Sequence, residues 1–178
     1  MKIENSTLED IPRIFEFYRI ATAYMKSKNQ VHWPEFSIDL IMHEINEHRQ
    51  WKLVMDQEIA CIWATTLEDE LIWGHNSKDP ALYIHRIAVN PDFRGKNLVN
   101  ELARWANDFG HSLDLKYIRI DTVGYNQALI SHYEKVGFEF LGMRKLANNA
   151  GLLDHYKEGE VCYFQKEIRN QSNAMRES

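Results

Sequence analysis

The sequence predicts an α/β fold built on a mixed β-sheet with helices on both of its faces. Segments with helical periodicity alternate along the chain with short apolar runs typical of strands. The expected order is a strand, two helices, a run of strands, then helix, strand, helix and closing strands. The chain has 178 residues, which suits one domain. We expect that domain to span residues 1–168, followed by an unstructured polar tail over 169–178.

The first elements follow from apolar spacing and from capping residues. A strand is expected over 2–6, and a helix follows with apolar residues at three- and four-residue steps. Pro12 must lie in the first turn of this helix, which favours Asp10 as its N-cap. A second helix is expected over 38–48 with Ser37 as its cap. The side chains expected to share its apolar face are Ile38, Ile41, Met42 and Ile45.

The rest of the chain shows a hairpin and then alternating elements. Strands over 51–55 and 58–67 are joined by the polar pair Asp56 and Gln57. The elements that follow are a strand over 81–89, a helix over 95–109, a strand over 117–121, a helix over 126–136, a strand over 138–141 and a closing strand over 161–168. Gly110 and Gly137 are expected to end the two helices. The segments around Gly74 and over 144–160 are expected to be loops.

Composition excludes several classes of protein. A net charge of −5 argues against a nucleic-acid binder. No apolar run approaches the roughly 18 residues that cross a bilayer, and the first residues lack a signal-peptide apolar region. Cys61 and Cys162 lie in apolar, strand-like runs, which favours buried thiols in a reducing compartment. We therefore expect a cytoplasmic protein without nucleic-acid or membrane partners, and we predict no metal site.

Two motifs carry the functional signal. The segment over 83–99 leads from a buried strand through a tight turn into a helix, whose unpaired N–H groups and positive dipole end attract a phosphate-bearing ligand. The segment over 126–138 reads N-x-x-L-x-x-x-Y-x-x-x-G-F. With these two motifs one unit apart, the sequence resembles the GNAT acetyltransferase family, closely over 81–141. The stretch over 85–89 and the pair Trp33-Pro34 resemble small-molecule acetyltransferases related to aminoglycoside-type enzymes.

The resemblance implies a GNAT acyl-CoA N-acyltransferase fold and acetyl-coenzyme A as cosubstrate. The pantetheine arm is then expected along the strand that ends Ile87-Ala88-Val89. Asn126 is expected to bind the coenzyme, and Tyr133 to face its sulfur. The N–H groups expected to hold the pyrophosphate belong to Arg94, Gly95, Lys96, Asn97, Leu98 and Val99.

The phosphate turn departs from the family pattern at two positions. Asn97 stands where the family usually has glycine, and Val99 where it has glycine or alanine. Asparagine is the non-glycine residue that best tolerates a positive φ, so the turn can form. The two larger side chains would, however, stand close to an approaching phosphate.

Acetyl transfer to an amine makes demands that particular residues could meet. A primary amine is mostly protonated at neutral pH and only its neutral form attacks a thioester, so a base is needed. His85 and Tyr83 are the candidates, and strict alternation places Ile87 and Val89 on the same face. Tyr133 is the candidate donor to the departing thiolate. All three could instead be packing residues of the core.

The acceptor and the oligomeric state stay open at this point. Trp33, Trp63 and Trp73 are candidates to line an acceptor pocket, although tryptophans on strands are as readily core residues. The leading hypothesis is an N-acetyltransferase that acts on the primary amine of a small molecule by direct attack. The alternatives are a non-catalytic domain that binds coenzyme A or a metabolite, and a protein N-acetyltransferase. The sequence does not decide between a monomer and a homodimer.

Overall fold

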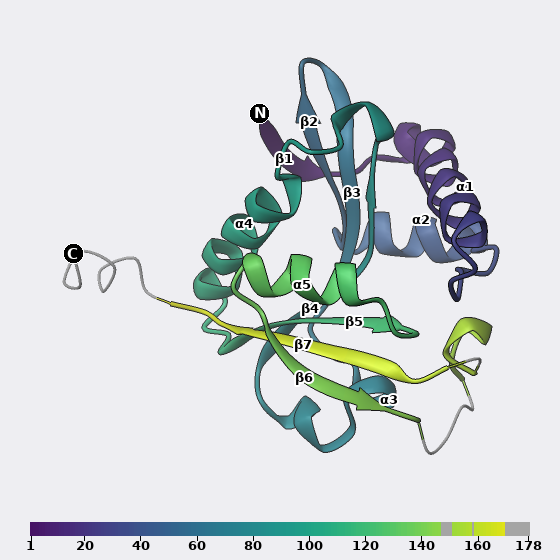
Figure 1. Ribbon diagram of the computed structural model, residues 1–178. Helices are drawn as coiled ribbons and strands as arrows, with labels where there is room; N and C mark the ends of the chain where they lie inside the picture. The colour runs from purple at the N-terminus through teal and green to yellow at the C-terminus, as the bar shows by residue number, and fades with distance from the viewer. Residues whose placement is uncertain (147–150, 158, 170–178) are drawn as a thin grey trace.

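The computed structural model describes residues 1–146, 151–157 and 159–169. These residues form one seven-stranded sheet with helices on both faces, as predicted (Figure 1). The strands are β1 (Lys2–Asn5), β2 (Gln50–Met55), β3 (Glu58–Thr66), β4 (Ala81–Val89), β5 (Tyr117–Val123), β6 (Glu139–Arg144) and β7 (Val161–Glu167). The helices are α1 (Ile11–Ser27), α2 (Ile38–Asn46), α3 (Glu70–Trp73), α4 (Leu98–Ser112) and α5 (Gln127–Lys135).

The sheet has the strand order β1-β2-β3-β4-β5-β7-β6. Its neighbours are antiparallel except β4 and β5, which run parallel. The pairing of β4 with β5 joins only Ala81–Ile84 to Tyr117–Ile120. Beyond these residues β4 continues along β3, and β5 continues along β7. The two central strands therefore separate in the middle of the sheet, which leaves a gap lined by their carboxyl-terminal halves.

Two apolar cores cover the two faces of the sheet. On one face, α1 and α2 pack through Ile14, Ile41 and Ile45 against Ile62 of β3 and Ala88 of β4. On the other face, α4 and α5 pack against the neighbouring residues of the same strands, and Figure 1 shows these two helices on the side opposite α1 and α2. Alternate residues of a strand point to opposite faces, so one strand serves both cores.

Local signals placed most element boundaries correctly. The turn between β2 and β3 has Asp56 and Gln57 at φ of 51° and 66°, the left-handed pair that a two-residue hairpin needs. Ser37 caps α2 by accepting a hydrogen bond from the Leu40 N–H at 3.2 Å. Gly137 follows α5 with a φ of 90°, as expected for the residue that ends a helix.

Tertiary contacts overrode the local signal at other positions. Gly110 lies inside α4, which continues to Ser112; a Cβ there would come within 2.5 Å of the Ile168 side chain, so close packing rather than a helix end accounts for the glycine. In α2, Ile38 and Met42 are 53% and 37% exposed, so the predicted apolar face is only half buried. The Asp10 side chain binds Lys52 and the Thr7 N–H instead of capping α1.

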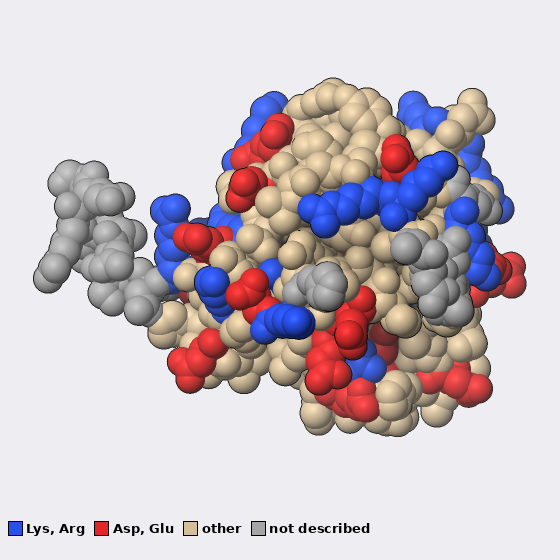
Figure 2. Space-filling view, turned by 90° about the horizontal axis from the view of Figure 1, so that it is seen from below, with Lys and Arg blue, Asp and Glu red and all other residues tan. Residues whose placement is uncertain are grey.

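Other expectations concern the cysteines, the surface and the termini. Cys61 and Cys162 are both free and buried, as predicted. Within the described part of the chain, no helix combines the length and the apolar character needed to cross a bilayer. Figure 2 shows a short band of Lys and Arg side chains above a group of Asp and Glu side chains, so both signs of charge share this face. Most of the expected tail, residues 170–178, and parts of the expected loop over 144–160 lie outside the described residues.

Candidate active site

A cavity of about 870 Å³ lies at the gap where β4 and β5 separate. Its size is within the range of small-molecule and cofactor sites. The end of α1, the start of α5 and the segment that follows β6 complete its walls. Representative lining residues are Trp33, His85, Ile87, Asp121, Asn126 and Tyr133. The strand separation thus brings the strand of the first motif and the helix of the second to one cavity.

A β-bulge in β4 shapes one wall of this cavity. Ile62 pairs with Ala88 and Ala64 with His85, so Trp63 of β3 stands opposite two residues of β4. One of the two, Arg86, has a φ of 52°. The extra residue reverses which face of the sheet the following side chains of β4 point to. Ile87 and Val89 therefore pack in the core under α4, on the face opposite Tyr83 and His85. The expectation of one shared face for these four residues was wrong, because it assumed a regular strand.

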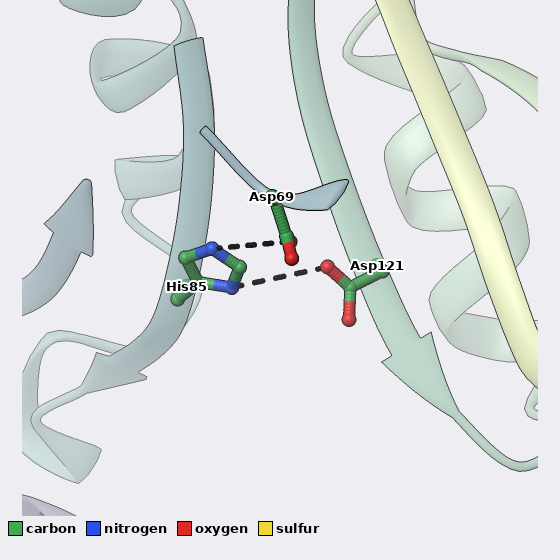
Figure 3. A group of neighbouring side chains, drawn as sticks. All are labelled: Asp69, His85 and Asp121. Carbon is green, nitrogen blue, oxygen red and sulfur yellow. Dashed lines mark ion pairs between the residues drawn. The ribbon is translucent and has the colours of Figure 1, made fainter. Parts of the chain in front are cut away.

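His85 faces two carboxylates that sequence reasoning missed (Figure 3). Its Nε2 is 3.5 Å from Oδ2 of Asp69, and its Nδ1 is 3.8 Å from Oδ1 of Asp121. The side chain of His85 is 20% exposed, whereas those of Asp69 and Asp121 are 10% and 2% exposed. His85 and Asp121 line the cavity, whereas Asp69, on the same side of the imidazole as Asp121 in Figure 3, does not.

The three groups come from different parts of the chain. Asp121 follows the last residue of β5 that pairs with β4, and its Oδ2 accepts a hydrogen bond from the Tyr156 hydroxyl at 2.6 Å. Asp69 directly precedes α3, and its Oδ2 is buried without a hydrogen-bond partner among the described residues. The position of Asp121 at the carboxyl end of a central strand was a usable signal. Nothing local marked Asp69.

Burial dominates the protonation of this cluster. It raises the pKa of Asp69 to about 7, with a further contribution from the negative charge of Asp121. It raises the pKa of Asp121 to about 6. It lowers the pKa of His85 to about 3, and the positive charges of Arg86 and Arg49 act in the same direction. The imidazole is therefore neutral at pH 7, and the carboxylates lack enough compensating positive charge.

The cluster also has the composition of a metal site. Donor atoms from Asp69, His85 and Asp121 all lie within 4.8 Å of one another. The imidazole presents a different nitrogen to each carboxylate (Figure 3). A proton can therefore pass between the two carboxylates through the ring, and the same two carboxylates can bind an ammonium group.

Tyr133 and Asn126 also line the cavity. Tyr133 is 5% exposed and packs against the rings of Phe138 and Phe164. Its hydroxyl has no hydrogen-bond partner within the described chain, and burial raises its pKa above the ordinary value. Asn126 caps α5, since its Oδ1 accepts from the Leu129 N–H at 3.1 Å. That bond leaves the amide N–H groups of Asn126 available to a ligand.

The turn before α4 has the predicted conformation. Gly95 and Asn97 have φ values of 79° and 54°, so asparagine occupies the left-handed position expected of it. Among the described residues, the backbone N–H groups of Gly95, Asn97, Leu98 and Val99 have no acceptor. The turn is exposed and lies outside the cavity lining. It offers unpaired donors at the start of a long helix, which is the chemistry of an anion site.

The remaining candidates separate into cavity and core. Trp33 lines the cavity, whereas Trp63 is fully buried under α4 and Trp73 is 4% exposed in a third apolar cluster. The Tyr83 hydroxyl accepts a hydrogen bond from Arg119 at 2.9 Å and packs beside Trp73. Trp63, Trp73 and Tyr83 do not line the cavity, so their positions indicate packing roles.

Comparison with known proteins agrees with this architecture. The uncharacterized N-acetyltransferase YesJ of Bacillus subtilis (strain 168) is 26% identical over 79% of this chain and 89% of its own. A GNAT-family acetyltransferase from Listeria monocytogenes 4b F2365 superposes with a TM-score of 0.74 at 20% identity, covering 94% of both chains. One from Streptococcus agalactiae 2603 gives 0.74 at 19% identity, covering 95% of this chain and 96% of its own. At such identities, these structures show a shared fold.

The family assignment comes from the sequence match. The model of the Acetyltransferase (GNAT) family matches residues 16–138, which is well over half of the chain and includes both motifs. The chain belongs to the GNAT acetyltransferase family.

Proposed function

We propose that this protein transfers the acetyl group of acetyl-coenzyme A to the primary amine of a small molecule. The observation that carries the proposal is a single cavity with two kinds of wall. One is formed by Ile87, Asn126 and Tyr133, and the other by His85 and Asp121, with Asp69 next to the imidazole. Acetyl transfer needs both a thioester site and a proton acceptor beside the amine.

The coenzyme is proposed to lie across the gap between β4 and β5. Acetyl-coenzyme A supplies the acetyl group as a thioester. The strand residues Ile87 to Val89 offer their backbone to the pantetheine arm in the manner of an added strand. The unpaired N–H groups at the start of α4 bind the pyrophosphate, and the free amide of Asn126 donates to the arm.

The acidic cluster prepares the amine. Asp121 lines the cavity and attracts the protonated amine, because its buried carboxylate lacks a cationic partner among the described residues to balance its charge. Deprotonating an amine of pKa ~10.4 at pH 7 costs roughly 4–5 kcal/mol. His85, neutral at this pH, accepts the proton at one ring nitrogen and passes the proton of its other nitrogen to an adjacent carboxylate, whose pKa burial raises to about 7 for Asp69 and about 6 for Asp121.

The proton balance of the transfer follows from these positions. The neutral amine attacks the thioester carbonyl carbon, a C–N bond forms, and the C–S bond breaks. The nitrogen gives up two protons in all, the first to His85 and the second to the departing sulfur. The Tyr133 hydroxyl donates a hydrogen bond to that sulfur as it acquires negative charge. A thiol of pKa ~8.5 is more acidic than tyrosine at ~10, so the hydroxyl need not transfer its proton completely.

Two measurements test the proposal. Acetyl-coenzyme A should raise the melting temperature, by an amount equivalent to roughly 2.7 kcal/mol at a hundredfold excess over Kd. Thiol release over a panel of small amines should then identify an acceptor. Stabilisation without release by any amine would favour the non-catalytic alternative, and release with peptides alone would favour a protein acetyltransferase. No stabilisation at millimolar coenzyme would refute the proposal.

A variant pair ties the activity to the cluster. His85→Ala should lower kcat/KM by at least about 100-fold while leaving stabilisation by acetyl-coenzyme A unchanged. His111→Ala, in the exposed last turn of α4, is the matched control and should retain full activity. Equal loss in both variants, or no loss in the first, would remove His85 from the mechanism.

The compartment is part of the same proposal. Cys61 and Cys162 are free and buried, which suits the reducing conditions of a cytoplasm.

A further inference from the structure

The proposed function requires an amine but leaves its chemical class open. We infer that the acceptor is an amino-carboxylate, a small zwitterion whose ammonium group faces Asp121 and His85 and whose carboxylate faces Arg49 and Arg86. This inference rests on the proposed function and names the substrate class of the same cavity. It excludes peptide amino termini and lysine side chains as preferred acceptors, because a neutral amide replaces the carboxylate in those groups.

A second charged group lines the cavity, and it is basic. Arg86 Nη2 lies 2.5 Å from both carboxylate oxygens of Glu44, and Arg86 Nε donates to the Tyr18 hydroxyl at 3.3 Å. Arg49 is more loosely held, with Nη1 3.9 Å from Glu44 and 3.4 Å from the Thr65 carbonyl oxygen. Arg49, Arg86 and Glu44 all line the cavity.

The charges of this wall do not cancel. Two guanidinium groups face one cavity-lining carboxylate, which leaves one net positive charge. The other partner of Arg49 is Glu47, at 2.6 Å from Nε, but Glu47 is 45% exposed and does not line the cavity. Water screens such an exposed partner far more than a buried one. A bound carboxylate would complete the neutralisation from the cavity side.

Both guanidinium groups keep a free donor nitrogen. Arg49 Nη2 and Arg86 Nη1 have no hydrogen-bond partner among the described residues. Neither nitrogen is fully buried. These nitrogens are therefore accessible. The side chains of Arg49 and Arg86 are only 28% and 12% exposed. The hydrogen bonds of their other nitrogens hold the two guanidinium groups in place. Guanidinium groups with free N–H donors are the usual partners of carboxylates in proteins.

The basic and acidic walls line one cavity and adjoin in the chain, because Arg86 follows His85 directly in β4. The charges of Arg86 and Arg49 contribute to the lowered pKa of His85, after the larger effect of burial, so they act electrostatically on the acidic cluster. Both walls belong to the cavity that also contains Tyr133 and Ile87. An amino-carboxylate carries its two opposite charges within a few bonds, which matches this pair of walls.

Matched acceptors test the inference directly. kcat/KM should be compared for each of a panel of free amino acids and for its primary carboxamide, which keeps the side chain and the amine but removes the negative charge. Removing that charge also makes the amine less basic, which by itself would make the carboxamide the faster acceptor. We expect the free amino acid to be preferred by about 10- to 100-fold, through a lower KM.

Variants then locate the carboxylate site. Arg49→Gln should raise KM for the amino acid about 10- to 100-fold, with little change in kcat or in stabilisation by acetyl-coenzyme A. Its effect on the carboxamide should be small, because that substrate has no charge to lose. Glu47→Gln, which removes the exposed partner of Arg49 but keeps the guanidinium, is the control and should not raise KM. If Arg49 serves only structure, its variant will lose thermal stability and affect both substrates equally.

The results separate this inference from the proposed function. Two results would overturn the inference and leave the acetyltransferase proposal intact. One is an equal kcat/KM for amino acids and their carboxamides. The other is a preference for amines without a carboxylate over both of these substrates. If no amine is acetylated, calorimetric titration of the complex with coenzyme A by amino acids still decides. Binding that Arg49→Gln weakens would support the carboxylate site without catalysis, and the lack of binding would overturn it.

Discussion

Replacing Asp69 by asparagine should stabilise the fold at neutral and alkaline pH while impairing catalysis. Asp69 is 10% exposed, and its Oδ2 is buried without a hydrogen-bond partner among the described residues. Among the described residues its ion-pair partner is His85, and burial keeps that imidazole neutral at pH 7 by lowering its pKa to about 3. An ionised Asp69 is thus a buried charge with little compensation, whereas asparagine has nearly the same shape and no charge.

The pKa shift of Asp69 sets the size of the effect. Burial raises this pKa from 3.8 to about 7, so the folded state binds more protons than the unfolded state between these values. The resulting destabilisation is complete above pH 7 and disappears as the pH falls below 3.8. About three pKa units correspond to about 4 kcal/mol at most. Part of the shift comes from Asp121, so we expect asparagine to add about 2–4 kcal/mol at pH 8.

Thermal and denaturant unfolding between pH 4 and 8 can measure this difference. For a domain of this size, about 2–4 kcal/mol corresponds to a rise of about 4–16 °C in Tm at pH 8. The advantage of the variant should shrink toward pH 4. Asp114→Asn, at an exposed position with a φ of 54° that asparagine adopts readily, is the control and should leave stability nearly unchanged at every pH.

The opposite change in activity completes this prediction. Without the Asp69 carboxylate next to His85, proton transfer through the imidazole loses a stabilising partner, so kcat/KM should fall by about 10- to 100-fold. A variant that is less stable than the wild type at pH 8, or more stable by an amount independent of pH, would refute the assignment of Asp69 as an uncompensated buried acid. Unchanged activity in the stabilised variant would remove it from the catalytic site.

Three further predictions address other parts of the site. Tyr133→Phe keeps the ring packing and should lower kcat by about 100- to 1,000-fold with coenzyme affinity nearly intact. Equal single-turnover rates would return Tyr133 to the core. Asn97→Gly should bind coenzyme A as tightly or more tightly in calorimetry, because its left-handed φ of 54° suits glycine and its side chain makes no capping bond. Weaker binding would instead indicate that its amide contacts a phosphate. For the wild type, kcat/KM should rise with pH up to about 7 as Asp121 and Asp69 ionise, since burial raises their pKa values to about 6 and about 7. A flat profile between pH 5 and 8, after correction for ionisation of the acceptor, would contradict this role of the cluster.

The sequence alone determined features that depend on neighbours along the chain. Apolar periodicity predicted the mixed sheet with helices on both faces, and turn chemistry located the hairpin at Asp56 and Gln57. The motif at Asn97 predicted a left-handed turn that opens a helix with free N–H groups. Both helix starts and tight turns are decided within about five residues, so a local pattern is enough to find them.

Other features depended on contacts between distant segments. The bulge at Arg86 inverts the alternation of β4 relative to β3, and no pattern within β4 announced it. Gly110 is a residue type typical of helix ends, yet it lies inside α4, where the nearby Ile168 side chain leaves no room for a Cβ. The same holds for the acidic cluster, because Asp69 and Asp121 are 52 positions apart in the printed sequence and meet only when α3 folds against β4 and β5.

The chemistry of the site therefore depends partly on local sequence and partly on contacts between distant segments. The sequence could name His85 and Tyr133 because the family resemblance marks their strand and helix. Burial and the charges that the tertiary structure places nearby decided the pKa of each group. The tertiary structure also decided that Tyr83 is a core residue and that Tyr133 lines the cavity. Desolvation and Coulomb interactions depend on distances through space, and only the assembled sheet with its diverging central strands fixes those distances.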